Sequence, residues 1–594
     1  MKVDTNALLM RTNERNRDPH DPGLGRPTAV QSGAAIGKVS SIGGTEARID
    51  LHTRLGANHK RAATVGAILG IQGETSLSVG LVTAVTAEST ASASNQELGA
   101  IMDIDLIGEI TSVDRSAVFH RGVTSYPTIG DEVTVLSDEY VQVVYDSNSA
   151  ASMHIGQLHQ RDRLPAHIDS NDTLQKHFAV LGSTGVGKSS GVVVLLRELM
   201  RARADLRVFL IDVHNEYGHC FGKRSEVLSP TTLTLPFWLL NFEELVEVLF
   251  RGRPVSDEET EILSDLVPEA KRMYGLANRD KQQLPPAWTV DTPVPYRIAD
   301  LEALINDRMG KLENKKDITT YRRLVRRIGV VSGDPRYDFM FDSANIGGDT
   351  MVEILRRLFP LPGDGKRITV LQLAGFPGEV MDTLVSVLGR MAFDLGLWTD
   401  GAVPLLFACE EAHRYAPADA KRGFDPTRRS ISRIAKEGRK YGVYLGLVSQ
   451  RPAELDQTIL SQCSTLFVMR LSNEKDQAII RAAVSDAGAR LLNFVPTLGT
   501  REVFAFGEGV RMPIRAEFKT LGSDERPRSE MGALATDTFG SPDDDFLRAA
   551  TARWRGAHQS NRTQSVMGSD RQVSRPLDPA RYSILKKADE SVVR

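Results

Sequence analysis

The hydrophobic pattern changes character several times along the chain. Residues 1–30 are polar and carry Pro and Gly, which is typical of a flexible arm. Through residues 31–165, short β-branched runs such as IGKVSSI, EARIDLH and EVTVLSDEYVQVVY alternate with Gly, Asn, Asp and Ser clusters. This alternation predicts a small antiparallel β-barrel or sandwich, for which a structural or assembly role is the simplest interpretation.

From residue 166 the pattern becomes one of strands that alternate with helices. Apolar runs such as HFAVLGS, RVFLIDV, VPLLFACEE and YGVYLGLVSQ are followed by segments of helical periodicity. Near-continuous apolar strands are buried on both faces, so 166–236 and 346–520 are predicted to form an α/β core around a mainly parallel sheet. The charged helical stretch 237–345 is predicted to be inserted into this core, and 521–594 to be a largely disordered tail.

Composition narrows the class of protein. A chain of 594 residues with 41% apolar and 25% charged residues is typical of a soluble protein of about three or four domains. The net charge of −3 requires any nucleic-acid site to be local. Cys220, Cys409 and Cys463 lack CxxC spacing, which favours neither a disulfide framework nor a zinc site. Without a signal peptide or an apolar run of about 20 residues, we expect a cytoplasmic protein with no membrane partner.

A phosphate-binding motif stands at the start of the predicted core. GSTGVGKS matches G-x-x-x-x-G-K-[ST] at each fixed position, between an apolar strand and a helical segment. In such a loop, backbone N–H groups and the helix N-terminus face the phosphates, Lys188 bridges the β- and γ-phosphates, and Ser189 reaches Mg²⁺. A chance match in a Gly-rich turn is disfavoured by the flanking elements. The residues predicted to bind ATP are Gly182, Ser183, Thr184, Gly185, Val186, Gly187, Lys188, Ser189 and Ser190.

Two carboxylates follow the apolar run LLFAC far downstream. In metal-dependent nucleotide hydrolases, one acid at this place joins the water shell of the metal and the next polarises the attacking water. We therefore predict Glu410 as a metal residue and Glu411 as the catalytic base. Glu410 is one methylene longer than the usual Asp, which an outer-shell carboxylate tolerates because Mg²⁺ keeps several waters. The alternative, an exposed helix start, is disfavoured because Val403–Cys409 is apolar.

Two later segments add candidate polar groups. Gln450 ends the apolar run LGLVSQ, where an amide can sense the γ-phosphate or position water, or can simply cap the strand. Arg439 lies near the end of the basic segment ISRIAKEGRKYG. An arginine aimed at the triphosphate of a neighbouring subunit stabilises transition-state charge, which requires a ring or at least a dimer.

The basic segment 421–440 is a candidate DNA-binding surface. Side chains that project into a pore would contact phosphates without reading the base sequence, and the DNA-binding candidates are Arg428, Arg429 and Arg433. A solvated helix face is an equal alternative for Arg428 and Arg429, since charge runs usually lie on the surface. For the second basic cluster, YRRLVRRIG at 321–329, a solvated helix face or a subunit contact is favoured.

Together these motifs resemble a known family. KHFAVL before the Gly-rich loop, IDVHNEYG, LLFACEEAH and KEGRKYGVYLGLVSQRPAEL are similar to the HerA branch of the HerA/FtsK superfamily of DNA-translocating ATPases. The 223 residues from Lys188 to Glu411 (411 − 188) exceed a bare RecA-like core, and the helical insertion accounts for the excess as it does in that family. The resemblance covers about residues 31–520. It implies a RecA-like P-loop NTPase core with a helical insertion, preceded by a small antiparallel β-barrel of the HAS type.

The resemblance also implies an assembly. HerA-type motors are homohexameric rings with ATP between subunits and double-stranded DNA in the central pore. By analogy Lys188, Ser189, Glu411 and Gln450 act in cis and Arg439 in trans. Lys176 stands where the family commonly has an Arg that is thought to contact a neighbour's nucleotide, and Lys lacks the planar fork for a bidentate contact.

Two questions stay open at this point. An acidic strand-end motif of the family is matched by Asp212, His214 and Glu216. A structural link between the Gly-rich loop and the sheet and a catalytic role are equal alternatives for these residues. HerA-type motors typically act with a separately encoded effector, a NurA-type or other nuclease or a sirtuin-like NADase, in DNA-end processing or antiviral defence. The alternative from another class is a nucleotide-dependent scaffold that activates a partner enzyme; a secretion or conjugation ATPase is disfavoured by the missing membrane segments.

Overall fold

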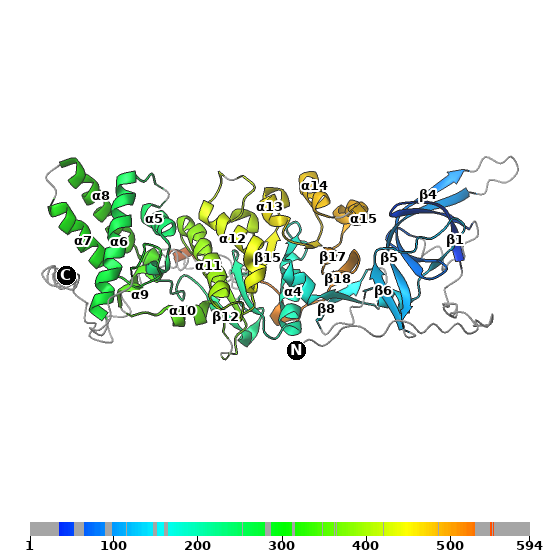
Figure 1. Ribbon diagram of the computed structural model, residues 1–594, viewed down its shortest axis with the longest axis horizontal. Helices are drawn as coiled ribbons and strands as arrows, with labels where there is room; N and C mark the ends of the chain where they lie inside the picture. Colours follow the sequence, from blue (N-terminus) through cyan, green and yellow to red (C-terminus); the bar gives the residue numbers. More distant parts are fainter. Residues whose placement is uncertain are drawn as a thin grey trace, which may run out of the picture. The chain divides into compact units, whose positions relative to one another are not determined.

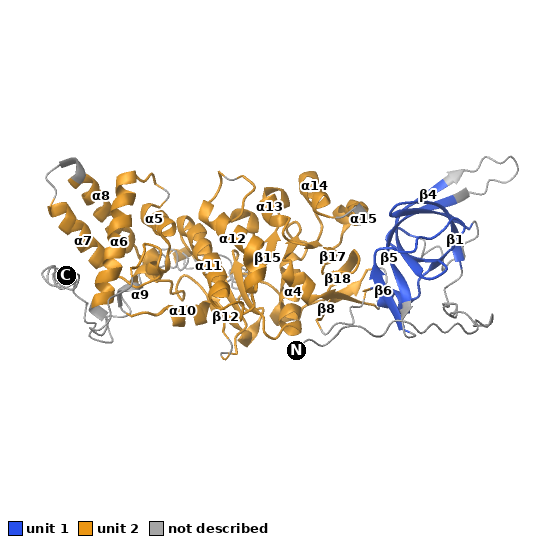
Figure 2. Cartoon of the chain, in the orientation of Figure 1, with its two compact units in different colours: residues 1–144 blue, residues 145–594 orange. Residues whose placement is uncertain are grey.

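The computed structural model divides the chain into two compact units, residues 1–144 and 145–594 (Figure 2). The predicted arm 1–30 and most of the predicted tail lie outside the described residues. The structure describes residues 35–528, together with 547–548 and 551, except for gaps at 53–63, 90–97, 114–115, 146–150, 160–163, 252, 279–286, 312–314, 347, 362, 364, 420 and 485.

Within the described residues, unit 1 is an antiparallel barrel. Its strand order is β2-β1-β7-β3-β4-β5-β6, and β2 also pairs with β5, which closes a barrel of six strands. Alternation explains the closure, since every second residue of β2 is buried and joins the core with Leu69, Val82 and Ile104. The strands are β1 (Ala35–Gly43), β2 (Glu46–Leu51), β3 (Ile68–Gln72), β4 (Leu77–Ser89), β5 (Leu98–Val113), β6 (Ser116–Arg121) and β7 (Glu132–Val135).

One segment of this unit that was predicted to be a strand is a strand only in its first part. The run EVTVLSDEYVQVVY forms β7 and then the helix α2 (Asp138–Tyr145). Asp138 and Glu139 occupy the first turn, where acidic groups favour a helix N-terminus, and Val141 and Val144 are buried at helical spacing. The β-branched composition had suggested a continuous strand, but packing of one helical face decided the outcome.

Unit 2 contains a large sheet that mixes parallel and antiparallel strands. The order of its described strands is β12-β13-β11-β14-β15-β10-β16-β17-β18-β8-β9, parallel up to β16 and antiparallel beyond it. The predicted α/β fold with a preceding antiparallel barrel is therefore confirmed. The strands are β8 (Ser152–Leu158), β9 (Pro165–Asp169), β10 (Phe178–Leu181), β11 (Arg207–Asp212), β12 (Ser225–Leu228), β13 (Ile368–Gln372), β14 (Leu405–Cys409), β15 (Val443–Ser449), β16 (Thr465–Val468), β17 (Glu502–Gly507) and β18 (Ile514–Phe518).

Strands β8 and β9 belong to this sheet although residues up to 165 were predicted to form the β domain. Gly156, Gln157 and Leu158 of β8 pair with β18, far along the sequence. The division between the units thus falls before β8, because the backbone hydrogen bonds of β8 and β9 are made with the large sheet and with each other.

The described helices cover the sheet and form the insertion. In Figure 1, α6, α7 and α8 lie side by side as a helical group, and contacts among all three support this arrangement. The helices of unit 2 are α3 (Ser170–Gln175), α4 (Lys188–Ala202), α5 (Phe242–Phe250), α6 (Asp257–Asn278), α7 (Ile298–Gly310), α8 (Lys315–Ser332), α9 (Asp338–Ile346), α10 (Met351–Leu358), α11 (Gly378–Trp398), α12 (Asp425–Glu437), α13 (Gln457–Leu460), α14 (Glu474–Ala483) and α15 (Asp486–Ala489).

The register of the parallel strands defines two edges of the sheet. Leu181 of β10 pairs with Ser449 of β15, and Cys409 of β14 pairs with Leu447. The Gly-rich loop, Glu410 and Gln450 follow these strands, so all three lie at the carboxyl edge, where open α/β sheets bind ligands. The segments that precede β10 and β15 lie at the opposite, amino edge.

Candidate nucleotide site

The Gly-rich loop joins β10 to α4 and is held from both sides. The Gly182 N–H donates to the Ser449 carbonyl at 3.2 Å, and the Arg501 N–H donates to the Val186 carbonyl at 2.9 Å. Gly187 has φ +89°, and a Cβ there would lie 3.1 Å from the Arg501 side chain. Glycine is therefore required at 187 both by the backbone conformation and by the close approach. Arg501 was not found from the sequence, since no motif marks it.

Lys188 and Glu411 meet across this loop. The distance from Lys188 Nζ to Glu411 Oε1 is 3.7 Å, and the two residues are 7% and 5% exposed. Burial lowers the pKa of Lys188, while the charges of Glu411 and Glu410 act in the opposite direction. The fold therefore brings together the predicted phosphate-binding cation and the predicted base from positions far apart in the sequence.

Glu410 has different partners from Glu411. Its carboxylate accepts hydrogen bonds from the Tyr217 hydroxyl at 3.1 Å and from the Val213 N–H at 3.3 Å. Burial raises the pKa of Glu410 to about 8, and the neighbouring charges of Asp212 and Glu216 add to the effect.

Tyr217 connects the two predicted metal residues. Its hydroxyl, which contacts Glu410, is also hydrogen-bonded to the Ser189 side chain. This tyrosine belongs to the segment IDVHNEYG, in which the sequence does not mark it as a site residue. Its place could not be inferred because the contact with Glu410 spans 193 residues.

These residues fit a nucleotide with Mg²⁺. Ser189 and Glu410 offer hydroxyl and carboxylate oxygens, and Mg²⁺ is usually bound by one or two protein oxygens together with phosphates and water. The described residues contain no group of three or more His, Cys, Asp or Glu that could hold a metal ion. Glu411 Oε2 is buried, makes no hydrogen bond to the described residues and lies 3.3 Å from His413 Nδ1.

Asp212 holds the turn that follows β11. Its carboxylate accepts the N–H groups of Glu216 at 3.0 Å and Tyr217 at 2.9 Å, which fixes the turn that carries Tyr217. Burial raises the pKa of Asp212 to about 6, although both of these hydrogen bonds favour the ionised form. His214 is about half exposed, with Nε2 at 3.9 Å from Glu411 Oε1.

Gln450 touches the Gly-rich loop directly. The Thr184 hydroxyl donates a hydrogen bond to Gln450 Oε1. The residue before it, Ser449, contacts His413 Nδ1 at 3.2 Å. The end of β15 is thus in contact with both the loop and the segment after β14.

Arg439 and Lys176 lie at the amino edge, away from this site. Arg439 is exposed and precedes β15, whose seven residues span about 23 Å at 3.3 Å per residue. Burial lowers the pKa of His177, just before β10, to about 4, and the nearby charge of Arg439 adds to this. Lys176 forms an ion pair with Glu508. Neither cation can reach phosphates bound by the Gly-rich loop of its own chain.

All three DNA-binding candidates on α12 form ion pairs within the chain. Arg428 lies 2.8 Å from Asp425, and Arg429 lies 2.6 Å from Glu243. Arg433 approaches Asp394 at 3.8 Å and stacks over a phenylalanine ring. This face of α12 is therefore ion-paired within the chain, and DNA binding by the three arginines stays a prediction. The basic cluster on α8 is likewise partly structural, since its Arg323 and Arg327 both contact Glu259.

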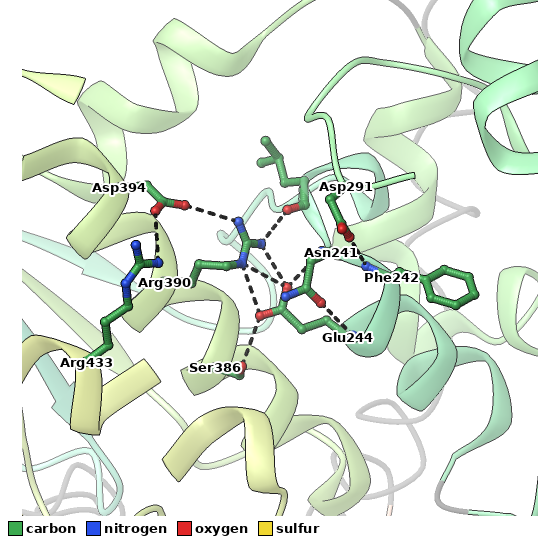
Figure 3. Close-up of polar contacts among 9 residues, drawn as sticks. Asn241, Phe242, Glu244, Asp291, Ser386, Arg390, Asp394 and Arg433 are labelled. Carbon is green, nitrogen blue, oxygen red and sulfur yellow. Dashed lines mark hydrogen bonds and ion pairs between the residues drawn. The ribbon is translucent and has the colours of Figure 1, made fainter. Parts of the chain in front are cut away.

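A polar network connects the insertion to α11 and α12 (Figure 3). Glu244 of α5 is fully buried and accepts hydrogen bonds from Ser386 at 3.0 Å and Arg390 at 2.8 Å. Arg390 also lies 3.6 Å from Asp394, which is the partner of Arg433. The network ties the insertion to the helix that leads to Arg439.

We expect Glu244→Ala to destabilise the protein by about 3–5 kcal/mol, because it leaves the Arg390 guanidinium without its buried counter-charge. Glu243→Ala is the matched control on the same helix, since Glu243 is exposed and its pair with Arg429 contributes about 1 kcal/mol or less. Urea-induced unfolding of the two variants measures the difference. Equal losses would contradict the assigned role of the network.

The fold and site define a P-loop ATPase: a Gly-rich loop between a parallel strand and a helix faces paired carboxylates at the carboxyl edge of the sheet. Residues 153–392 match the family model described as the central domain of helicase HerA, a range that includes Lys188 but ends before Glu410. The chain therefore contains a segment that matches the HerA central domain, and the resemblance to this family is confirmed.

Two named relatives are similar to this chain over a longer stretch than the family model. The DNA double-strand break repair helicase HerA of Pyrococcus furiosus is 25% identical over 425 residues, which cover 65% of this chain and 72% of the relative. The protein of the same name from Sulfolobus acidocaldarius is 25% identical over 414 residues, covering 67% and 76%. The similarity to both therefore extends beyond the matched central domain.

Two solved structures align with this chain at low sequence identity. The bacterial conjugative coupling protein TrwB aligns with a TM-score of 0.43 at 15% identity, over 66% of this chain and 94% of its own. VirB4 of Thermoanaerobacter pseudethanolicus aligns with a TM-score of 0.42 at 16% identity, over 64% and 99%. In the described part of this chain, no helix is both long and apolar enough to cross a membrane.

Proposed function

We propose that this protein hydrolyses ATP with Mg²⁺ to drive movement along double-stranded DNA as a homohexameric ring. The observation that carries the proposal is the meeting of Lys188 and Glu411 at 3.7 Å beside the Gly-rich loop. Hydrolysis of ATP requires a cation that holds the γ-phosphate and a carboxylate that activates the attacking water. Lys188 and Glu411 place these two groups in contact inside a buried site.

Each residue of the site has a role in this scheme. The loop N–H groups and Lys188 bind the phosphates, and Ser189 and Glu410 hold Mg²⁺ with its waters. The bound ion neutralises charge that develops on the phosphates. Glu411 orients the attacking water and receives its proton, and Gln450 stands next to the loop to sense the γ-phosphate.

A neighbouring subunit completes the site. Arg439 is exposed at the amino edge, beyond the start of a strand about 23 Å long that ends beside the Gly-rich loop, and it makes no ion pair with a described residue. We assign it the role of an arginine finger acting on the next subunit, with Lys176 as a weaker contact at the same edge.

Duplex DNA is the proposed track. Two relatives are named DNA double-strand break repair helicases, which supports DNA as the substrate. We further propose a separately encoded effector, a NurA-type or other nuclease or a sirtuin-like NADase, in DNA-end processing or antiviral defence. Copurification of the native chain with its effector tests this part.

An ATPase assay with and without linear duplex DNA tests the motor. We expect DNA to raise the turnover number several-fold, and the stimulation to fall with salt because phosphate contacts release counterions. Lys188→Ala with DNA is the control for contaminating ATPases. An ATP turnover number that does not change with DNA would favour the alternative, a scaffold whose nucleotide state assembles a partner enzyme.

A further inference from the structure

His413 lies between the ends of two core strands. It belongs to the short turn of residues 412–414 that directly follows Glu411. Its Nδ1 is 3.3 Å from Glu411 Oε2 and 3.2 Å from Ser449 Oγ, and its side chain is 12% exposed. One ring nitrogen therefore contacts both the end of β14 and the end of β15.

The backbone at Glu411 makes this contact possible. Glu411 has φ +49°, a left-handed conformation that costs a non-glycine residue about 1–3 kcal/mol. The Arg414 N–H closes the turn by donating to the Glu411 carbonyl at 2.9 Å. The strained turn brings the imidazole of His413 back onto the carboxylate two residues before it.

The two oxygens of Glu411 have different surroundings. Oε1 faces Lys188, whereas Oε2 is buried, makes no hydrogen bond to the described residues and lies beside His413. Lys188 is the group assigned to the phosphates of ATP. Once it contacts a nucleotide, the orientation of Glu411 depends more strongly on its Oε2 side.

The Ser449 hydroxyl group, which contacts His413, is itself held in place by the backbone. Its hydroxyl oxygen accepts the Arg451 N–H at 3.0 Å, which holds it at the end of β15. The next residue, Gln450, accepts a hydrogen bond from Thr184 of the Gly-rich loop. A continuous set of contacts therefore runs from the loop through the end of β15 and His413 to Glu411.

We infer that His413 is a positioning residue that holds the Glu411 carboxylate in place for hydrolysis by tethering it to Ser449. This inference rests on the proposed role of Glu411 as the base. In the Nδ1–H tautomer the single hydrogen can be shared between Glu411 Oε2 and Ser449 Oγ as a three-centre hydrogen bond, so one nitrogen holds both oxygens.

Steady-state ATPase kinetics of the full chain test the inference. We expect His413→Ala to lower kcat by about 10- to 100-fold, because a base displaced by about 1 Å loses this much, with KM for ATP changed by less than about twofold. His413→Asn places its amide where Nδ1 lies, and we expect it to recover most of the loss. His413→Gln reaches only the position of Nε2, and we expect it to stay low.

Glu411→Gln separates this inference from the proposed function. If His413 acts through Glu411, His413→Ala is expected to lower kcat by less than about twofold further in the Glu411→Gln background. Parental turnover in Glu411→Gln alone would overturn the assigned base, and the inference with it. Loss of turnover in Glu411→Gln together with parental turnover in His413→Ala would overturn the inference alone.

The variants His413→Asn and His413→Gln keep the inference testable if His413→Ala does not fold. If His413→Ala is unfolded by circular dichroism, the Asn and Gln variants decide, since both fill the site with a polar group. Equal kcat values in the two would overturn the inference. A higher kcat for Asn, with equal binding of a fluorescent ATP analogue, would support it.

Discussion

Glu411→Gln is expected to lower the kcat of ATP hydrolysis by about 10²- to 10⁴-fold, the range contributed by a positioned general base. The amide keeps the shape of the side chain but cannot accept the proton of the attacking water. ATP binding is expected to remain, because the Gly-rich loop and Lys188 are unchanged. Phosphate release under steady state and binding of a fluorescent ATP analogue measure the two effects.

Lys188→Ala is the complementary variant. It removes the cation that lies 3.7 Å from Glu411, so we expect nucleotide binding itself to weaken. The contrast between the two variants is the informative result. Parental turnover in Glu411→Gln would refute its role as base, and unchanged ATP affinity in Lys188→Ala would refute the phosphate assignment.

Arg439→Ala is expected to lower ATP turnover by about 10³-fold or more, as the loss of an arginine finger does. ATP affinity in cis is expected to be retained, because Arg439 lies at the amino edge of the sheet. Arg429→Ala is the control on the preceding helix, since Arg429 is engaged with Glu243. We expect the control to hydrolyse ATP at nearly the parental rate.

Coexpression of two inactive chains tests whether Arg439 acts in trans. When Arg439→Ala and Lys188→Ala chains assemble together, an intact loop from the first can meet an intact arginine from the second. In an equimolar random mixture about a quarter of the interfaces are of this kind, so partial recovery of turnover is expected. No recovery in verified mixed assemblies would contradict the assignment.

Local sequence determined the Gly-rich loop, the buried parallel strands and the presence of a helical insertion. The loop was predictable because its turn requires glycine at fixed positions, and Gly185 and Gly187 do adopt positive φ. The strands were predictable because burial on both faces leaves a continuous apolar run. Strands β8, β9, β12 and β18 were missed because edge and half-buried strands show mixed patterns.

Tertiary structure alone decided which polar groups meet. Arg433 pairs with Asp394 of α11, and Arg429 pairs with Glu243 of α5 as well as with Asp425 of its own helix, so the local pattern reveals only one of these three contacts. The contacts of Tyr217 with Glu410 and of His413 with Ser449 arise because strands distant in the sequence end at one edge of the sheet. The sequence by itself determined what each strand end carries, and the order of strands decided which ends are neighbours, since hydrogen bonding across a sheet does not follow chain order.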